Sequence, residues 1–247
     1  MLVTHSSPNK AKFEKRWADR KSRVAQLNGF RFFTLLKRVD IEGVTDYSKE
    51  GDFGNYVSFT IWEDKDSFDA WRTGDAFKEA HGGGGITDFI QLLTTAIFIL
   101  DGGPKPAFYD ALLPQKGQEA EALLQLASEG GWRKVQADGQ TELPAEIFVS
   151  QNRYSIPSKD VLSFEQANSK LSRDYAKEYS GFVGSFLQRR DAAKADDGFN
   201  YIATTIWTDR KAYDAFAASS ADGFNIPAPS GKVFYEGKLV LSSEKGV

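Results

Sequence analysis

The sequence contains two related halves, and this duplication restricts the fold more than any other feature. The segment YVSFTIWEDKDSFDAW at 56–71 matches YIATTIWTDRKAYDAF at 201–216, with seven of sixteen positions identical. Upstream, FEKRW begins at Phe13 and FEQAN begins at Phe164, and a Gly-Phe pair follows each of them. The repeat length of about 145 to 152 residues is far above the roughly 20 to 50 residues of solenoids and propellers. It therefore indicates a duplicated domain.

Both halves show the same predicted order of elements: strand, helix, strand, strand, helix, strand. In the first half an amphipathic helix is predicted at 10–27, strands at 30–39 and 56–62, and a further β-prone run at 94–100. This is the order of the ferredoxin-like βαββαβ unit, in which helices cover one face of an antiparallel sheet. Because the other face also needs cover, we expect the two sheets to face each other. The sequence thus predicts an α+β fold of the dimeric α/β-barrel type, fused in one chain.

These boundaries divide the chain into three parts. The first repeat is placed at 1–104 and the second at 146–247. Residues 105–145 are expected to connect them, with a helix near 118–127 and turns at the glycine- and proline-rich stretches.

Composition excludes several classes of function. The chain has 247 residues, a net charge of -3 and no cysteine, so thiolate nucleophiles, disulfides and cysteine-bound metals are absent. A weakly acidic chain has no basic field for nucleic acid, and the longest apolar run, TTAIFIL, is too short to span a bilayer. We therefore expect a soluble protein with neither nucleic acid nor membrane as a partner.

The segment FDAWRTGDAFKEAHGGGG at 68–85 combines features that suit a large flat ligand. The helix that carries Trp71 is predicted to break at Gly74, and Asp75 can cap a new short helix. Along a straight helix, ten residues would turn His81 about 280° away from Trp71, so the break is what lets both face one cavity. Four glycines after His81 leave space beside its ring. The alternative is a surface histidine at a helix end, followed by a flexible loop.

The run WEDKDSFDAW, followed ten residues later by His81 and preceded by FEKRWADR, resembles the antibiotic-biosynthesis-monooxygenase superfamily and, within it, the IsdG-type heme-degrading monooxygenases. The resemblance covers most of residues 1–100, and a weaker copy covers about 146–240. It implies that His81 is the iron ligand and that Trp71 is the catalytic residue over the opposite heme face. It further implies contacts from four residues around the heme, with the arginine paired to a propionate: Trp17, Arg20, Phe68 and Phe77.

The same resemblance implies a reaction and its requirements. Heme is both cofactor and substrate, and the porphyrin ring is opened with O2, which releases iron. Electrons come from an external donor, either a reductase or a ferredoxin-like protein. The bulky indole of Trp71 is expected to deform the macrocycle on its distal face.

The family's third functional residue, an asparagine on the first strand, does not match in the first repeat. Counting back from FEKRW places it at Met1 or beyond, whereas counting back from FEQAN reaches Asn152. The second repeat also has Phe216 at the position of Trp71 and no later histidine. We therefore expect one heme site, in the first repeat. The second repeat is interpreted as a degenerate scaffold, in which Asn152 is a strand-end residue.

Other functions fit the same sequence. A cofactor-independent monooxygenase of this superfamily would oxidise a phenolic or quinone substrate, and a heme carrier would bind through His81 without cleaving the ring. A structural or interaction module would bind no heme. IsdG-type proteins of one repeat form homodimers by facing their sheets, so the resemblance implies that two repeats in one chain make a monomer that acts as an internal pseudo-dimer. The tandem arrangement resembles plastid members of the family from algae, which implies a chloroplast location, or otherwise a cytoplasmic one.

Overall fold

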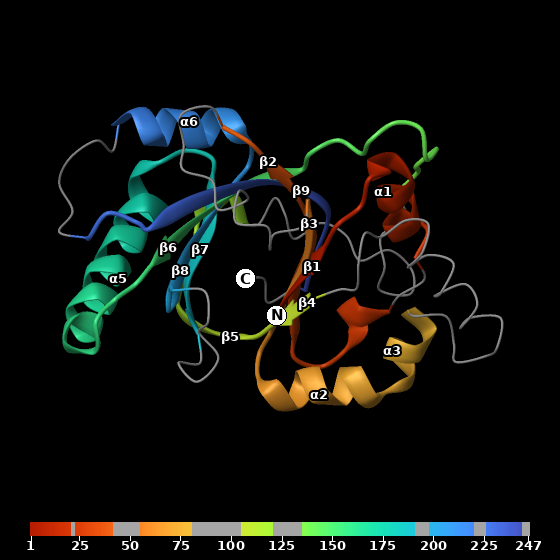
Figure 1. The fold of residues 1–247 in the computed structure, drawn as a ribbon, viewed down its shortest axis with the longest axis horizontal. Coiled ribbons are helices and arrows are strands. Elements are labelled where there is room, and N and C mark those ends of the chain that lie inside the picture. The colour runs from red at the N-terminus through yellow and green to blue at the C-terminus, as the bar shows by residue number, and fades with distance from the viewer. Residues whose placement is uncertain are drawn as a thin grey trace.

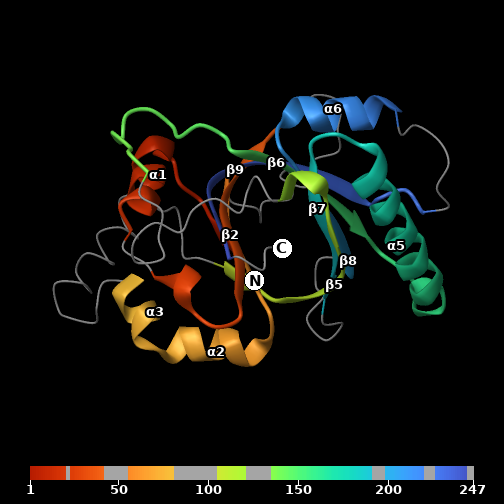
Figure 2. The ribbon, with the colours of Figure 1, turned by 180° about the vertical axis from the view of Figure 1, so that it is seen from behind.

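The two repeats lie side by side, with their strands in the middle of the molecule and their helices on the outside (Figures 1 and 2). The computed structural model describes residues 1–20, 23–41, 55–80, 105–120, 135–190, 198–219 and 226–243. The first repeat contains β1 (Leu2–His5), α1 (Lys10–Ala18), β2 (Phe30–Val39), β3 (Tyr56–Trp62), α2 (Lys65–Thr73), α3 (Asp75–Ala80) and β4 (Lys105–Ala107). It is followed by β5 (Tyr109–Lys116), β6 (Ile147–Tyr154), α5 (Val161–Glu178), β7 (Phe182–Arg190), β8 (Tyr201–Trp207), α6 (Arg210–Ser219) and β9 (Gly231–Ser242).

Within the described residues, nine strands form one antiparallel sheet in the order β4-β1-β3-β2-β9-β6-β8-β7-β5. The runs β4-β1-β3-β2 and β9-β6-β8-β7 each have the strand order of a ferredoxin-like unit. The two units join where β2 pairs with β9, from Phe32 opposite Ser242 to Val39 opposite Phe234. The predicted fold class, two ferredoxin-like repeats with antiparallel sheets in one chain, is confirmed.

The segment from β4 to β5 connects the two ends of this sheet. Only Phe108 separates the two strands, yet β4 pairs with β1 at one end and β5 pairs with β7 at the other. The sheet therefore closes into a barrel, which protects its edge strands from pairing with other chains. The predicted connecting segment thus supplies two barrel strands. The β-prone run at 94–100 and most of the helix expected at 118–127 lie outside the described residues.

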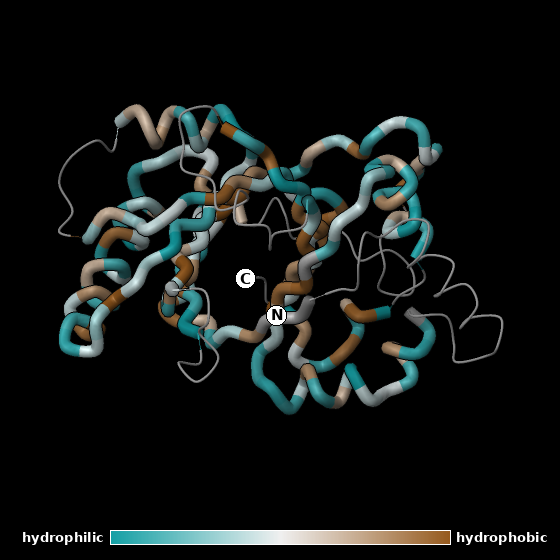
Figure 3. Tube along the Cα trace, viewed as in Figure 1, coloured by the Kyte–Doolittle hydropathy of each residue, from teal (hydrophilic) through white to brown (hydrophobic). Residues whose placement is uncertain are grey.

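Apolar side chains pack both inside the barrel and beneath the helices. Inside, Phe59 from the first repeat stacks on Phe186 from the second, with ring centroids 5.6 Å apart. On the outer face of the sheet, separate clusters lie under α1 and under α5 and α6. The tube in Figure 3 shows apolar residues concentrated along the strands and hydrophilic residues along the outer turns. A site between the outer face of the sheet and the helices that pack on it can therefore be lined by side chains from both.

In the first repeat, the predicted helices and strands that fall on described residues agree with the structure except at the first helix. Strands β2 and β3 have the predicted bounds, but α1 ends at Ala18 instead of continuing to residue 27. The apolar stripe continues in a short 3-10 turn, η1 (Val24–Gln26), which buries Val24 in the same cluster. The apolar spacing therefore predicted correctly which side of this segment is buried, although the chain is no longer α-helical there. Within the described ranges, no helix is long and apolar enough to cross a membrane.

Candidate functional site

Strand pairing defines which positions of the two repeats are equivalent. Tyr56 and Tyr201 begin the repeated segment, and they pair with His5 on β1 and with Tyr154 on β6. His5 therefore occupies the place in the first repeat that Tyr154 occupies in the second. Both side chains lie on the outer sheet face, where each packs against the phenylalanine of the first helix of its repeat.

The same register corrects the position expected for the family asparagine. Two residues before these positions lie Val3 and Asn152, so the counterpart of Asn152 is Val3 and not Met1. Counting from the helix failed because the link from strand to helix is shorter in the first repeat. Eight residues lead from the end of β1 to Phe13, whereas ten lead from the end of β6 to Phe164.

The predicted helix break next to Trp71 is confirmed. Helix α2 ends at Thr73, Gly74 caps it by donating its backbone N–H to the Trp71 carbonyl oxygen at 3.1 Å, and α3 begins at Asp75. A Cβ at Gly74 would lie 2.8 Å from the Ala70 carbonyl oxygen, so a side chain there would need the helix end to shift. At the break α3 leaves the direction of α2 (Figure 1), while Phe77 on α3 stays in contact with Trp71. His81 itself lies outside the described residues.

Trp71 belongs to an aromatic cluster that includes two other predicted site residues. The centroid of its half-buried ring lies 5.4 Å from the ring centroid of Trp62, 5.6 Å from that of Phe68 and 5.1 Å from that of Phe77. Phe68 is buried and also contacts Phe108 between β4 and β5. The structure thus brings Phe68, Trp71 and Phe77 together, and a ligand at this place would meet a rigid aromatic wall.

Trp17 and Arg20 form a second group at the end of α1. The guanidinium of Arg20 lies 4.7 Å from the ring centroid of Trp17, which stacks on Phe33 at 5.5 Å. The sequence placed Arg20 on the helix, but it follows the helix end. Burial, followed by the nearby charge of Arg16, lowers the pKa of Arg20 to about 10, and burial lowers the pKa of Arg16. Arg16 has no ion pair with any described residue, so this end of α1 favours an anionic group.

His5 joins this second group and was missed by the sequence analysis. Its ring centroid is 5.9 Å from that of Trp17, and its Nε2 lies 3.2 Å from Ser58 Oγ. Burial, followed by the charge of Arg20, lowers the pKa of His5 to about 4, so the imidazole is neutral at neutral pH. The one sequence signal was rarity, since the chain has only two histidines. Within the described residues, no three histidine or carboxylate groups are placed to hold a bare metal ion.

The second repeat contains a cavity of about 460 Å³ between its outer sheet face and helices α5 and α6. Asn152 lies within β6 and lines this cavity, so the interpretation of Asn152 as a strand-end residue was wrong. Its Oδ1 and the Oγ of Ser185 are buried without a hydrogen bond to any described residue. Phe216 also lines the cavity and stacks on Trp207 with ring centroids 4.8 Å apart, and the equivalent Trp71 in the first repeat contacts Trp62 in a tilted arrangement.

Three tyrosines complete the polar part of this cavity. Burial raises the pKa of Tyr154 to about 12, and hydrogen bonding from Asn152 partly offsets that effect. Burial also raises the pKa values of Tyr175 and Tyr213. All three phenols are therefore neutral at physiological pH and can donate or accept hydrogen bonds.

Comparison with known proteins agrees with this architecture. Over the whole chain, the fold is similar to a proposed monooxygenase from Lactobacillus acidophilus NCFM, with 9% identity, a TM-score of 0.59 and coverage of 99% of this chain and 95% of the other. A proposed monooxygenase from Fusobacterium nucleatum gives 11% identity, a TM-score of 0.55 and coverage of 100% and 94%. These likenesses show the fold. No curated protein matches. In sequence, residues 2–83, about a third of the chain, match the model of the antibiotic biosynthesis monooxygenase family.

Proposed function

We propose that this chain is a heme-degrading monooxygenase and that its first repeat carries the heme. The family match covers residues 2–83 and so includes both Trp71 and His81. The observation that carries the proposal is the helix break at Gly74, which redirects the chain between these two residues. A straight helix would point them to different sides of the molecule.

Two groups of residues, the aromatic cluster around Trp71 and the group of Trp17 and Arg20 at the end of α1, suit a ligand that is flat, largely apolar and anionic. His81 would hold the iron, since a neutral imidazole is an iron ligand that leaves the opposite face accessible. Arg20 and Arg16 supply cations where a propionate would relieve their mutual repulsion. When bound, heme supplies the iron that activates O2 and is itself the substrate, with electrons from an external donor.

The aromatic cluster has a different task. Trp71 is braced by Trp62, Phe68 and Phe77, so its indole cannot move away easily when a macrocycle presses against it. A fixed bulky ring at this place would exclude water and would press against a flat ligand bound beside it. We therefore assign Trp71 to shaping the ligand and His81 to holding it.

Titration of the purified full-length chain with hemin tests the binding step. The parent protein is expected to give a Soret shift that saturates at one equivalent, and His81→Ala is expected to abolish it. His5→Gln is the matched control, because it removes the other histidine of the chain and should keep the shift. A parent protein without any Soret shift, or a shift lost in His5→Gln and kept in His81→Ala, would overturn the assignment.

Aerobic reduction then tests turnover. With ascorbate as the electron donor and catalase present to remove free peroxide, the Soret band of the heme complex should decay and iron should be released. A stable Soret band under these conditions would favour a heme carrier over an enzyme.

A further inference from the structure

The inner face of the barrel has buried polar side chains in the second repeat at positions where the first repeat has apolar ones. Gln151 on β6 is buried, and strand register makes it the counterpart of Leu2 on β1. In the same way, the buried Gln188 on β7 is the counterpart of Leu36 on β2. Both leucines belong to the apolar core inside the barrel. Because leucine fills these positions in the first repeat, the barrel itself does not require polar groups there.

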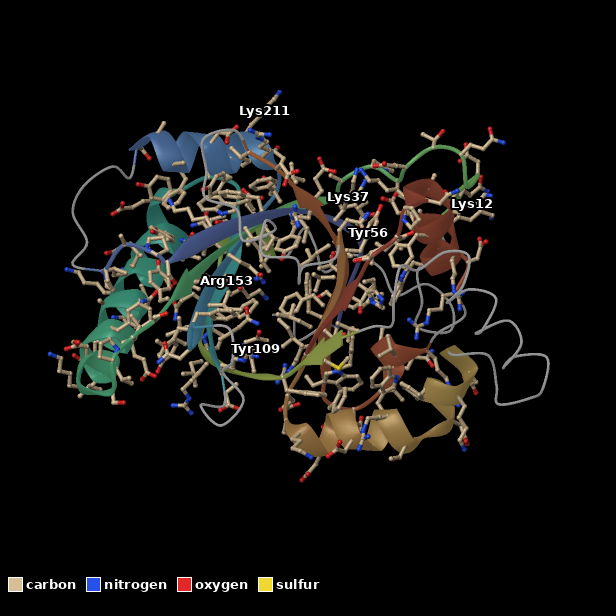
Figure 4. All side chains as sticks on the ribbon, viewed as in Figure 1. Lys12, Lys37, Tyr56, Tyr109, Arg153 and Lys211 are labelled. Carbon is tan, nitrogen blue, oxygen red and sulfur yellow. The ribbon has the colours of Figure 1, made fainter. Side chains whose placement is uncertain are left out.

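Two arginines continue this polar group toward one end of the barrel. Arg153 lies two residues after Gln151 on β6, so the alternation of side chains along a strand places it on the same inner face. Arg190 lies in the same relation to Gln188 on β7. Their guanidinium carbons are 4.8 Å and 5.4 Å from the ring centroid of Phe199, a member of the inner core. Two positive charges therefore lie around one aromatic ring, and Figure 4 shows Arg153 on the side of the second-repeat strands that faces the middle of the molecule.

In these side chains, the buried atoms that make no hydrogen bond are donors. Gln151 is 2% exposed, and its Nε2 is buried without a hydrogen-bond partner among the described residues. Each arginine has interactions with other groups. Even so, Nε and Nη1 of Arg153 and Nη1 of Arg190 are buried and make no hydrogen bond within the described structure. Buried donors are costly without an acceptor, so these side chains favour a ligand that offers several acceptor oxygens.

We propose that Gln151, Arg153 and Arg190 form a site for a phosphate group, carried by inorganic phosphate or by a small phosphate ester. Guanidinium and amide N–H groups match the oxygen atoms of a phosphate, and two positive charges balance its negative charge. The donors come from β6 and from β7, with β8 between them, so they reach a ligand from different directions, which suits a tetrahedral anion better than a planar carboxylate. Opposite Arg153 on β9 lies Gly231, which has no side chain and leaves space on the inner face. Arg190 ends β7 and is partly exposed, so the site can be reached from that end of the barrel.

Isothermal titration calorimetry of the full-length chain tests the proposal with inorganic phosphate and with glycerol 3-phosphate, in a chloride buffer of constant ionic strength. The parent protein is expected to bind one equivalent of at least one of these compounds. Gln151→Leu repeats the leucine of the first repeat, so it should fold, which circular dichroism checks. It should weaken binding about tenfold, as expected for the loss of one hydrogen bond to a charged group. Tighter binding of glycerol 3-phosphate would identify an ester as the ligand class and tighter binding of inorganic phosphate the free anion, and either result supports the site.

A charge variant and its matched control complete the test. Arg190→Met removes one cation at a partly exposed strand end and should weaken binding more than Gln151→Leu does. Arg38→Met is the control, because Arg38 on β2 is the counterpart of Arg190 and pairs with the exposed Asp40, so this variant should leave phosphate binding unchanged. Absence of saturable binding of either compound to the parent protein, or binding that Gln151→Leu or Arg190→Met leaves unchanged, would overturn the proposal. The site lies inside the barrel and the proposed heme site lies outside it, so failure of the heme proposal would leave the phosphate result unchanged.

Discussion

Replacing Lys238 by methionine should destabilise the protein strongly, because Lys238 is the cation of a buried charge network. Its side chain is 3% exposed and its Nζ lies 3.6 Å from Oε1 of Glu14, whose side chain is fully buried. It also donates to the carbonyl oxygen of Leu143. Glu14 accepts hydrogen bonds from the Tyr56 hydroxyl at 2.6 Å and from the backbone N–H of Leu143. The network therefore connects β9, α1, β3 and the segment before β6. Figure 4 shows Tyr56 in the region between the first-repeat strands and α1.

The expected cost can be worked out from these contacts. Removing one partner of a buried ion pair costs about 3 to 5 kcal/mol, because an uncompensated charge stays behind. In Lys238→Met, Glu14 would keep two hydrogen-bond donors, which favours the lower end, about 3 kcal/mol. The double variant Lys238→Met with Glu14→Gln removes both charges and should recover about 2 kcal/mol of this loss.

Urea unfolding, followed by tryptophan fluorescence and circular dichroism, measures these differences. Lys37→Met is the control, since Lys37 pairs with Glu142 at a more exposed place in the same region and should cost about 1 kcal/mol or less. A loss below about 1 kcal/mol in Lys238→Met, or a double variant less stable than either single variant, would refute the reasoning.

Three further predictions follow from the two repeats. Trp71→Phe should bind hemin within about twofold of the parent but degrade it more slowly, and unchanged Soret decay would reject the shaping role. Because the folded pKa of His5 is about 4 and its unfolded value is near 6.5, the unfolded chain binds more protons between these pH values. The contribution of His5 to the free energy of unfolding is thus complete above about pH 6.5. It falls by up to about 3 kcal/mol as the pH is lowered to about 4. His5→Gln should flatten this slope in urea titrations at several pH values, and an identical slope would contradict the assigned pKa. The chain should sediment as a monomer of 27.4 kDa. Two single-repeat chains would have to pair to form the barrel, whereas this chain forms it alone. An obligate dimer would argue against the internal pseudo-dimer.

The repeat and the strand patterns predicted most of the architecture, because both depend on local periodicity. The bounds of β2 and β3 and the break at Gly74 could be predicted since a β-prone run, a glycine and a capping aspartate act within a few residues. The length of α1 could not, because a 3-10 turn keeps Val24 buried and leaves the same apolar pattern in the sequence.

The candidate site divides in the same way. The sequence by itself led to the hypothesis that Trp71 and His81 face one ligand, because the spacing of these two residues matches a family motif. Only the tertiary structure decided that Val3 is the counterpart of Asn152, that His5 lies against Trp17, and that the second repeat contains a cavity. Strand register, packing between distant segments and the space left beneath helices depend on residues far apart in the chain, and no local pattern encodes how those residues meet.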